Sequence, residues 1–242
     1  MKKIILMLTL LMFCNAVYAD NMLVNYFKKW VDETRIENAI GKLLLDQFTN
    51  DLHSEFQIKE DDKLTQRFVN FLEKCGIKNN GGMNSKVFVI ESSIPDEILL
   101  PGGILILTRG YLKFAASEEQ EDFILARNAF LVFQKQPLAV IKREGIYPKF
   151  LDCIKQKEAK RSEEKVRELL RTYLSIVGKM NHKKADVQGA MITKYPDKTR
   201  LGAIEMLGRF TVRVWPPSPF DTIDLPSRID ELNKIKLPEQ NL

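Results

Sequence analysis

Histidine is the side chain that most often binds zinc or transfers protons near neutral pH, and this chain contains two, His53 and His182. They lie 129 residues apart, so no H-x-x-x-H pair exists that could place two imidazoles on one face of a helix. The glutamate of an H-E-x-x-H motif also has no counterpart, because that motif needs both flanking histidines. The sequence therefore excludes a zinc site of this helical kind.

Cysteine offers the other common zinc ligand, and the chain has three: Cys14, Cys75 and Cys153. None has metal-ligand spacing to a second cysteine or to a histidine. Cys75 and Cys153 are either joined in a disulfide or present as free thiols. A disulfide needs their Cα atoms to lie within about 7 Å of each other, and the sequence does not give that distance. Cys153 falls in an apolar, helix-like run, which is typical of a buried thiol.

The first 19 residues have the organisation of a bacterial secretory signal. Lys2 and Lys3 precede an apolar run from residue 4 to 13, and a small-x-small pattern ends at Ala19. The run is shorter than the roughly 20 residues that a permanent membrane span needs. We expect cleavage after Ala19 and a periplasmic or secreted protein; a lipid anchor at Cys14 and a retained signal anchor are the alternatives.

The formal net charge is +5, and removal of a leader containing Lys2 and Lys3 lowers it to +3. So small an excess does not indicate nucleic-acid binding, and we expect no nucleic-acid partner. The remaining length suits one core. We predict a lead-in helix at residues 20–34, a single domain at 35–237 and a loose tail at 238–242.

The centre of the chain predicts two strands followed by a long helix. Lys86–Glu91 and Ile104–Thr108 are rich in β-branched and apolar residues, and the turn sequence Pro101–Gly103 precedes the second of them. Ser117 and Gln120 form a capping box at the start of an apolar helix that reaches Phe133. We therefore expect an α+β fold, with helices around a small β-sheet.

Helical patterns also lie on both sides of this centre. Residues 22–56 and 62–75 show helical apolar spacing, and Gly41 marks either a break in the first helix or a close contact. Residues 150–180 alternate apolar and charged positions. The mixed charges are typical of a solvated helix face, and the alternative is an arm that contacts acidic partners or lipid headgroups at a membrane surface.

Three landmarks occur in an order that resembles the HtpX- and BepA-type zinc metallopeptidase family. DEILLPGGILILTRGYL, residues 96–112, is similar to the family's strand with its P-G-G turn. LARNAFLV, residues 125–132, stands where the family has L-A-H-E-x-x-H-V, and HKKADVQGA, residues 182–190, stands where it has E-x-E-A-D-x-x-G. With weaker likeness at both ends, the resemblance covers residues 35–235 and implies a zincin-type fold.

The resemblance implies a zinc site whose chemistry is missing here. Arg127, Asn128 and Leu131 occupy the places of the motif's His, Glu and second His, and His182 occupies the place of the third zinc ligand. Arginine stays protonated, leucine has no lone pair to donate, and asparagine is too weak a base to activate water. We therefore predict no catalytic residues, no metal and no cofactor, and we expect Asp186 to pair with Arg127.

These observations predict a pseudo-peptidase that binds a protein or peptide as an envelope assembly, chaperone or regulatory factor. The resemblance implies that the strand would act as an edge that pairs with extended polypeptide through Ile104, Leu105, Ile106, Leu107 and Thr108. One alternative is an active enzyme, either a metallopeptidase with an unusual metal site that uses His182, Asp186 and a further carboxylate, or another hydrolase with a different chemistry. Another is a structural domain unrelated to the family. The oligomeric state stays open.

Overall fold

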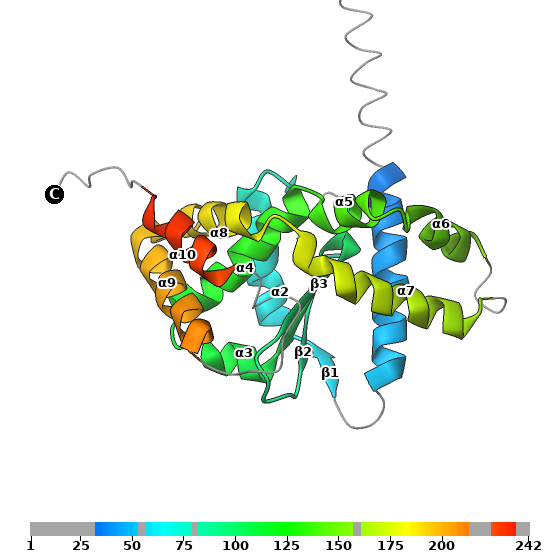
Figure 1. Cartoon of the computed structure of the whole chain (residues 1–242), viewed down its shortest axis with the longest axis horizontal. Coiled ribbons are helices and arrows are strands. Elements are labelled where there is room, and N and C mark those ends of the chain that lie inside the picture. The colour runs from blue at the N-terminus through cyan, green and yellow to red at the C-terminus, as the bar shows by residue number, and fades with distance from the viewer. Residues whose placement is uncertain (1–31, 53–56, 79–81, 157–160, 213–223, 236–242) are drawn as a thin grey trace, which may run out of the picture.

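The computed structural model describes residues 32–52, 57–78, 82–156, 161–212 and 224–235. These residues are mainly helical and enclose one small mixed sheet, so the predicted α+β class is confirmed (Figure 1). The predicted leader, most of the lead-in helix, the tail and His53 lie outside the described residues. Within the described ranges, no helix combines the length and apolarity needed to cross a bilayer.

The sheet contains four strands, β1 (Ile58–Glu60), β2 (Lys86–Ile90), β3 (Glu97–Leu100) and β4 (Ile104–Thr108), in the order β1-β2-β4-β3. β4 runs parallel to β2 and antiparallel to β3, while β1 is antiparallel to β2. β2 and β4 are the two strands that sequence predicts. Their parallel pairing requires a crossover connection, and β3 is part of that connection.

The P-G-G turn, η3 (Pro101–Gly103), connects β3 to β4. It does not connect β2 to β4, because β3 lies between β2 and the turn along the chain. Gly102 and Gly103 have φ values of 77° and 80°, a region that glycine enters without steric penalty. A Cβ on Gly41 would lie 2.0 Å from the Pro101 carbonyl oxygen. Gly41 therefore marks a close contact, and the helix over residues 32–52 continues through it.

The expectation that Ile104–Thr108 forms a sheet edge is wrong. β4 pairs with β2 on one side and β3 on the other, so both rows of its backbone hydrogen-bonding groups face neighbouring strands. All five of its residues are buried. An added peptide strand has no free side of β4 to join, and β3 is the edge at this end of the sheet.

One helix runs through the middle of the molecule, and the others surround it and the sheet (Figure 1). The central helix is α4 (Glu118–Phe133), which Ser117 caps by accepting a hydrogen bond from the Gln120 amide. In Figure 1, α8, α9 and α10 gather on one side of α4, and α6, α7 and the helix over residues 32–52 lie on the other. The remaining helical elements are α2 (Asp62–Lys74), α3 (Arg109–Phe114), α5 (Gln136–Arg143), α6 (Tyr147–Lys155), α7 (Glu163–Ile176), η5 (Val177–Lys179), α8 (His182–Met191), α9 (Pro196–Val212) and α10 (Leu225–Asn233).

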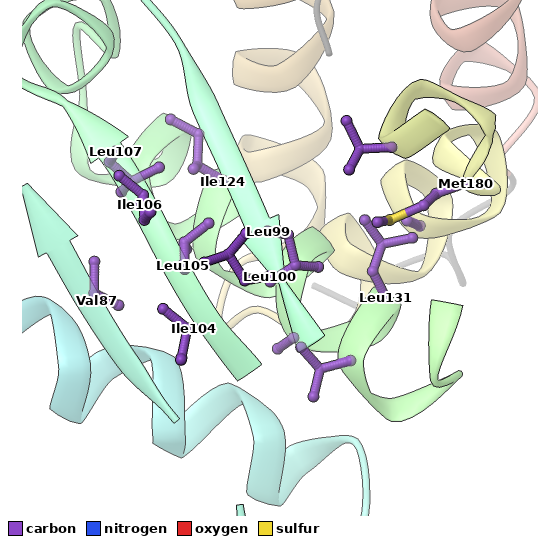
Figure 2. Close-up of a cluster of buried hydrophobic side chains, with 14 of the residues drawn as sticks. Val87, Leu99, Leu100, Ile104, Leu105, Ile106, Leu107, Ile124, Leu131 and Met180 are labelled. Carbon is purple, nitrogen blue, oxygen red and sulfur yellow. The ribbon is translucent and has the colours of Figure 1, made fainter. Parts of the chain in front are cut away.

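The apolar core joins α4 to the sheet. Figure 2 shows Ile124 among side chains of β3 and β4, and Leu131 near Met180 at the other end of the cluster. Burying a leucine or isoleucine side chain contributes about 1.5–3 kcal/mol. The core therefore holds α4 in a fixed position, and any polar side chain on its inner face must find partners inside the protein.

Candidate functional site

α4 carries a charged side chain into the centre of the protein. Arg127 is 1% exposed, and every residue of α4 from Phe123 to Val132 is buried. An isolated charge in such a place would cost several kcal/mol of solvation free energy. The position is therefore tolerable only because other charged groups reach the same point.

Arg127 contacts three partners from two different segments, β3 and α8. Its Nη1 donates to Glu97 on β3, and its Nε donates to Oδ1 of Asp186 on α8 at 2.7 Å. Its Nη2 lies 2.8 Å from Nδ1 of His182. Since a guanidinium has no acceptor, this imidazole nitrogen accepts the hydrogen bond. Burial lowers the pKa of Arg127, but the charges of Glu97 and Asp186 outweigh that effect and raise the pKa above its ordinary value.

A second arginine completes the surroundings of Asp186, which is fully buried. Arg228 of α10, 2% exposed, donates from Nε to Oδ2 at 2.5 Å and from Nη2 to Oδ1 at 3.1 Å. Burial raises the pKa of Asp186, but the charges and hydrogen bonds of Arg228 and Arg127 outweigh it, so the pKa lies below its usual range. Asp186 is therefore ionised and held between two arginines.

Asn128 satisfies the other oxygen of Glu97. Its Nδ2 donates to Glu97 Oε2 at 2.8 Å and to the Ile124 carbonyl at 2.9 Å. We call the six residues Glu97, Arg127, Asn128, His182, Asp186 and Arg228 the buried network. It ties β3, α4, α8 and α10 together through side chains alone.

The A-D-x-x-G sequence in α8 has a steric explanation. Asp186 and Gly189 are three residues apart and so lie on the same face of the helix. A Cβ on Gly189 would lie 2.6 Å from the backbone nitrogen of Arg127 and 2.7 Å from its Cα. The missing side chain lets α8 approach α4 closely enough for Asp186 to reach the guanidinium.

The residues at this place do not fit the zinc ion that the resemblance implies. The Arg127 guanidinium stands between His182 and the carboxylates, and both oxygens of Asp186 accept hydrogen bonds from arginine. Burial, followed by the charges of Arg127 and Arg228, lowers the pKa of His182 to about 3, so the ring is neutral and oriented toward an arginine. Among the described residues, no three His, Cys, Asp or Glu side chains gather so that they could hold a metal.

Part of this network could be predicted from the sequence. Arg127, Asn128, His182 and Asp186 are candidate residues that the structure brings together, and the expected contact between Arg127 and Asp186 is present. Leu131 lies apart, in the apolar core (Figure 2). The roles of Glu97 and Arg228 were missed. The signal that could have identified Glu97 is its position directly before the apolar run of Ile98, Leu99 and Leu100.

Beside the network, at β3, lies an apolar pocket of about 320 Å³. We call it the β3 pocket. Glu97, whose carboxylate belongs to the network, forms part of its wall together with Asp96. Ile106 and Thr108 of β4 contribute side chains, although β4 offers no free backbone. The other apolar lining residues are Phe48, Leu52, Ile90, Ile98 and Leu174.

α7 covers this end of the sheet. The Tyr173 hydroxyl donates to the backbone carbonyl of Leu99, a group on the outer side of β3, and Leu174 lines the β3 pocket. The opposite face of α7 is charged and mostly exposed, as the mixed-charge pattern predicts. Part of the β3 edge is thus already occupied by a side chain of the protein itself.

The two described cysteines lie outside both places. Cys75 and Cys153 are free thiols, which answers the question that their spacing left open. Burial raises the pKa of the Cys75 thiol to about 11. The Cys75 thiol is therefore not poised as a nucleophile at neutral pH.

The sequence matches no protein-family model and no curated protein in the comparisons made. A function for this chain must therefore be argued from the buried network and the β3 pocket.

Proposed function

We propose that this chain is an exported, catalytically degenerate protein of metallopeptidase-like, zincin-type fold that binds an apolar segment of a polypeptide. Its role would be that of an envelope assembly, chaperone or regulatory factor. The proposal is supported by two neighbouring features: an arginine network where the resemblance implies a metal, and an apolar pocket beside it.

The β3 pocket is the observation that carries the proposal. Its volume of about 320 Å³ lies at the lower end of the 300–1,000 Å³ that is usual for ligand sites. Apolar side chains form most of its wall, and the few polar groups come from Asp96, Glu97 and two hydroxyl residues. Such a pocket suits one or two apolar side chains of a peptide.

The edge of β3 limits how a peptide can bind at this pocket. Leu99 and Leu100 are fully buried and the Leu99 carbonyl already accepts from Tyr173, whereas Ile98 is only partly buried. A long added strand would have to displace α7. Binding by insertion of side chains into the pocket, with few backbone hydrogen bonds, needs no such movement.

The test is direct binding of fluorescein-labelled peptides, measured by fluorescence anisotropy. Peptides with leucine or phenylalanine at alternate positions should bind, and the same peptides with serine at those positions should not. Leu174→Glu places a charge at the pocket wall and should weaken binding by about tenfold or more. Leu201→Glu is the matched control, because Leu201 is 57% exposed on α9 and outside the pocket.

Two results would overturn the proposal. One is equal binding of the apolar and serine peptides, and the other is equal loss of binding in the Leu174→Glu and Leu201→Glu variants. Elemental analysis of the purified protein tests the enzyme alternative: stoichiometric metal would require a ligand set other than the one described here.

A further inference from the structure

A second cavity, of about 440 Å³, lies at the His182 end of the buried network. His182 and Arg228 form its inner wall. Its mouth is lined by Arg143 at the end of α5, Lys179 of η5 and Lys183 in the first turn of α8. Gln136, Met180, Asn181 and Asp224 complete the lining. We call it the basic cavity.

Positive charge exceeds negative charge around this cavity. Its walls carry the four cations Arg143, Lys179, Lys183 and Arg228, and the one carboxylate of Asp224. Two carboxylates outside the lining offset part of the excess, since Glu144 contacts Lys179 and Arg143 while Asp186 holds Arg228. One positive charge remains without a balancing carboxylate in this group.

The cations at the mouth can exchange their partners at little cost. Lys179 pairs with Glu144 at 2.6 Å and Lys183 with Asp224 at 2.6 Å, and the two lysine side chains are 52% and 44% exposed. Exposed pairs of this kind contribute about 0–1 kcal/mol each. A ligand that offers better-placed anionic oxygens can therefore recruit both lysines.

Arg228 differs from the mouth residues because its position is fixed. It is 2% exposed and bonded through two nitrogens to Asp186, so it needs no reordering when a ligand arrives. The cavity also lies at the N-terminal end of α8, where the helix dipole adds positive potential. A rigid inner cation with mobile cations at the mouth suits a ligand that carries more than one negative charge.

We propose that the basic cavity binds a small molecule or group carrying two or more anionic oxygen centres, either phosphates or clustered carboxylates. Arg143 and the lysines contact the outer charges, and the wall formed by Arg228 and His182 faces the inner end of the ligand. This inference does not depend on peptide binding at the β3 pocket, because the two cavities share no lining residue.

The experiment is isothermal titration calorimetry of the purified protein with pyrophosphate and, separately, with citrate, at constant ionic strength. Saturable binding of either probe is expected. The double variant Lys179→Gln/Lys183→Gln should lose about tenfold or more in affinity, because each lysine supplies a charge-assisted hydrogen bond. Arg143→Gln, tested alone, should also weaken binding.

The matched control is Lys42→Gln/Lys234→Gln. Both of its lysines are exposed and ion-paired, with Asp46 at 3.0 Å and Glu231 at 2.8 Å, but neither lines the cavity. The control should bind the probes as the unaltered protein does. Preference for pyrophosphate would assign the site to phosphate ligands, and preference for citrate to carboxylates. Absence of saturable binding by the unaltered protein, or equal loss in the control, would overturn the proposal.

Discussion

Arg127 and Arg167 each contact carboxylates from separate parts of the chain, in very different surroundings. Arg127 reaches Glu97 and Asp186 in the interior, where it is 1% exposed. Arg167 on α7 reaches Asp51 at 3.0 Å, Glu163 at 2.6 Å and Glu164 at 3.2 Å, and its side chain is 29% exposed. By number of carboxylate partners, the surface cluster is the larger.

Solvent access, and not the number of contacts, determines how much stability is lost when one partner of an ion pair is removed. At the surface, water solvates each charge when a partner is removed, so exposed pairs contribute little. In the interior, removal of one partner leaves a charge with neither water nor a counterion. The effects of four substitutions on stability should therefore decrease from the interior to the surface.

The largest effect is expected for Asp186→Asn. Within the buried network, the substitution leaves Glu97 as the remaining carboxylate for Arg127 and Arg228, and it should lower the free energy of unfolding by about 3–5 kcal/mol. Chemical denaturation measures this. Lys183→Asn, three residues away in an exposed pair with Asp224, is the control and should change stability little. Equal effects of the two variants would show that the network does not act as a buried ionic unit.

A steric substitution tests the closeness of α4 and α8. Gly189→Ala places a Cβ within 2.6 Å of the Arg127 backbone nitrogen and should destabilise by about 1–3 kcal/mol, since backbone cannot move aside easily. Gly208→Ala is the matched control: it lies in α9 with nothing within 4 Å of its added Cβ, and should stabilise by up to about 1 kcal/mol. Thermal unfolding of both variants measures these changes. Destabilisation of both variants by the same amount would contradict a close approach of α4 and α8 at Gly189.

The pH dependence of stability tests His182. Its pKa is about 3 in the folded protein and 6.5 ordinarily, so between these values the unfolded chain binds a proton that the folded protein does not. Stability should therefore fall with decreasing pH below about 6.5, by about 2 kcal/mol between pH 7 and pH 5 from this group alone. His182→Gln keeps an acceptor for Arg127 without titrating, and should flatten the profile by that amount. An unchanged pH dependence of stability in this variant would show that a group other than His182 takes up the proton on unfolding.

The smallest effect is expected for Arg167→Gln. Its carboxylate partners are exposed or half-exposed and remain hydrated after the substitution. The midpoint of thermal unfolding should shift slightly in low salt, and the shift should vanish in high salt because ions screen surface pairs. A shift as large as that of Asp186→Asn would mean that exposure does not separate the two clusters.

Much of the local structure could be predicted because short-range patterns determine it. Ser117 caps α4 as its capping box indicates, α2 begins and ends within a residue of its predicted bounds, and β2 and β4 lie at the predicted positions. Propensity, capping and turn chemistry act over a few residues, so they can be recognised along the chain. β3 was missed because three of its four residues, Ile98 to Leu100, belong to an apolar stretch that continues through the turn into β4.

By itself, the sequence determined which chemistry this protein lacks: with histidines only at positions 53 and 182, and Arg127 at the centre of the helix, an H-E-x-x-H zinc site cannot form. The resemblance predicted the pairing of Arg127 with Asp186, but the tertiary structure alone decided that Glu97, 30 residues away along the chain, is a counterion of Arg127 as well. It also decided that β3, and not β4, forms the edge beside the pocket. The physical reason is the same in both cases. Ion pairing in the interior and strand order depend on which distant segments meet, and no local periodicity carries that information.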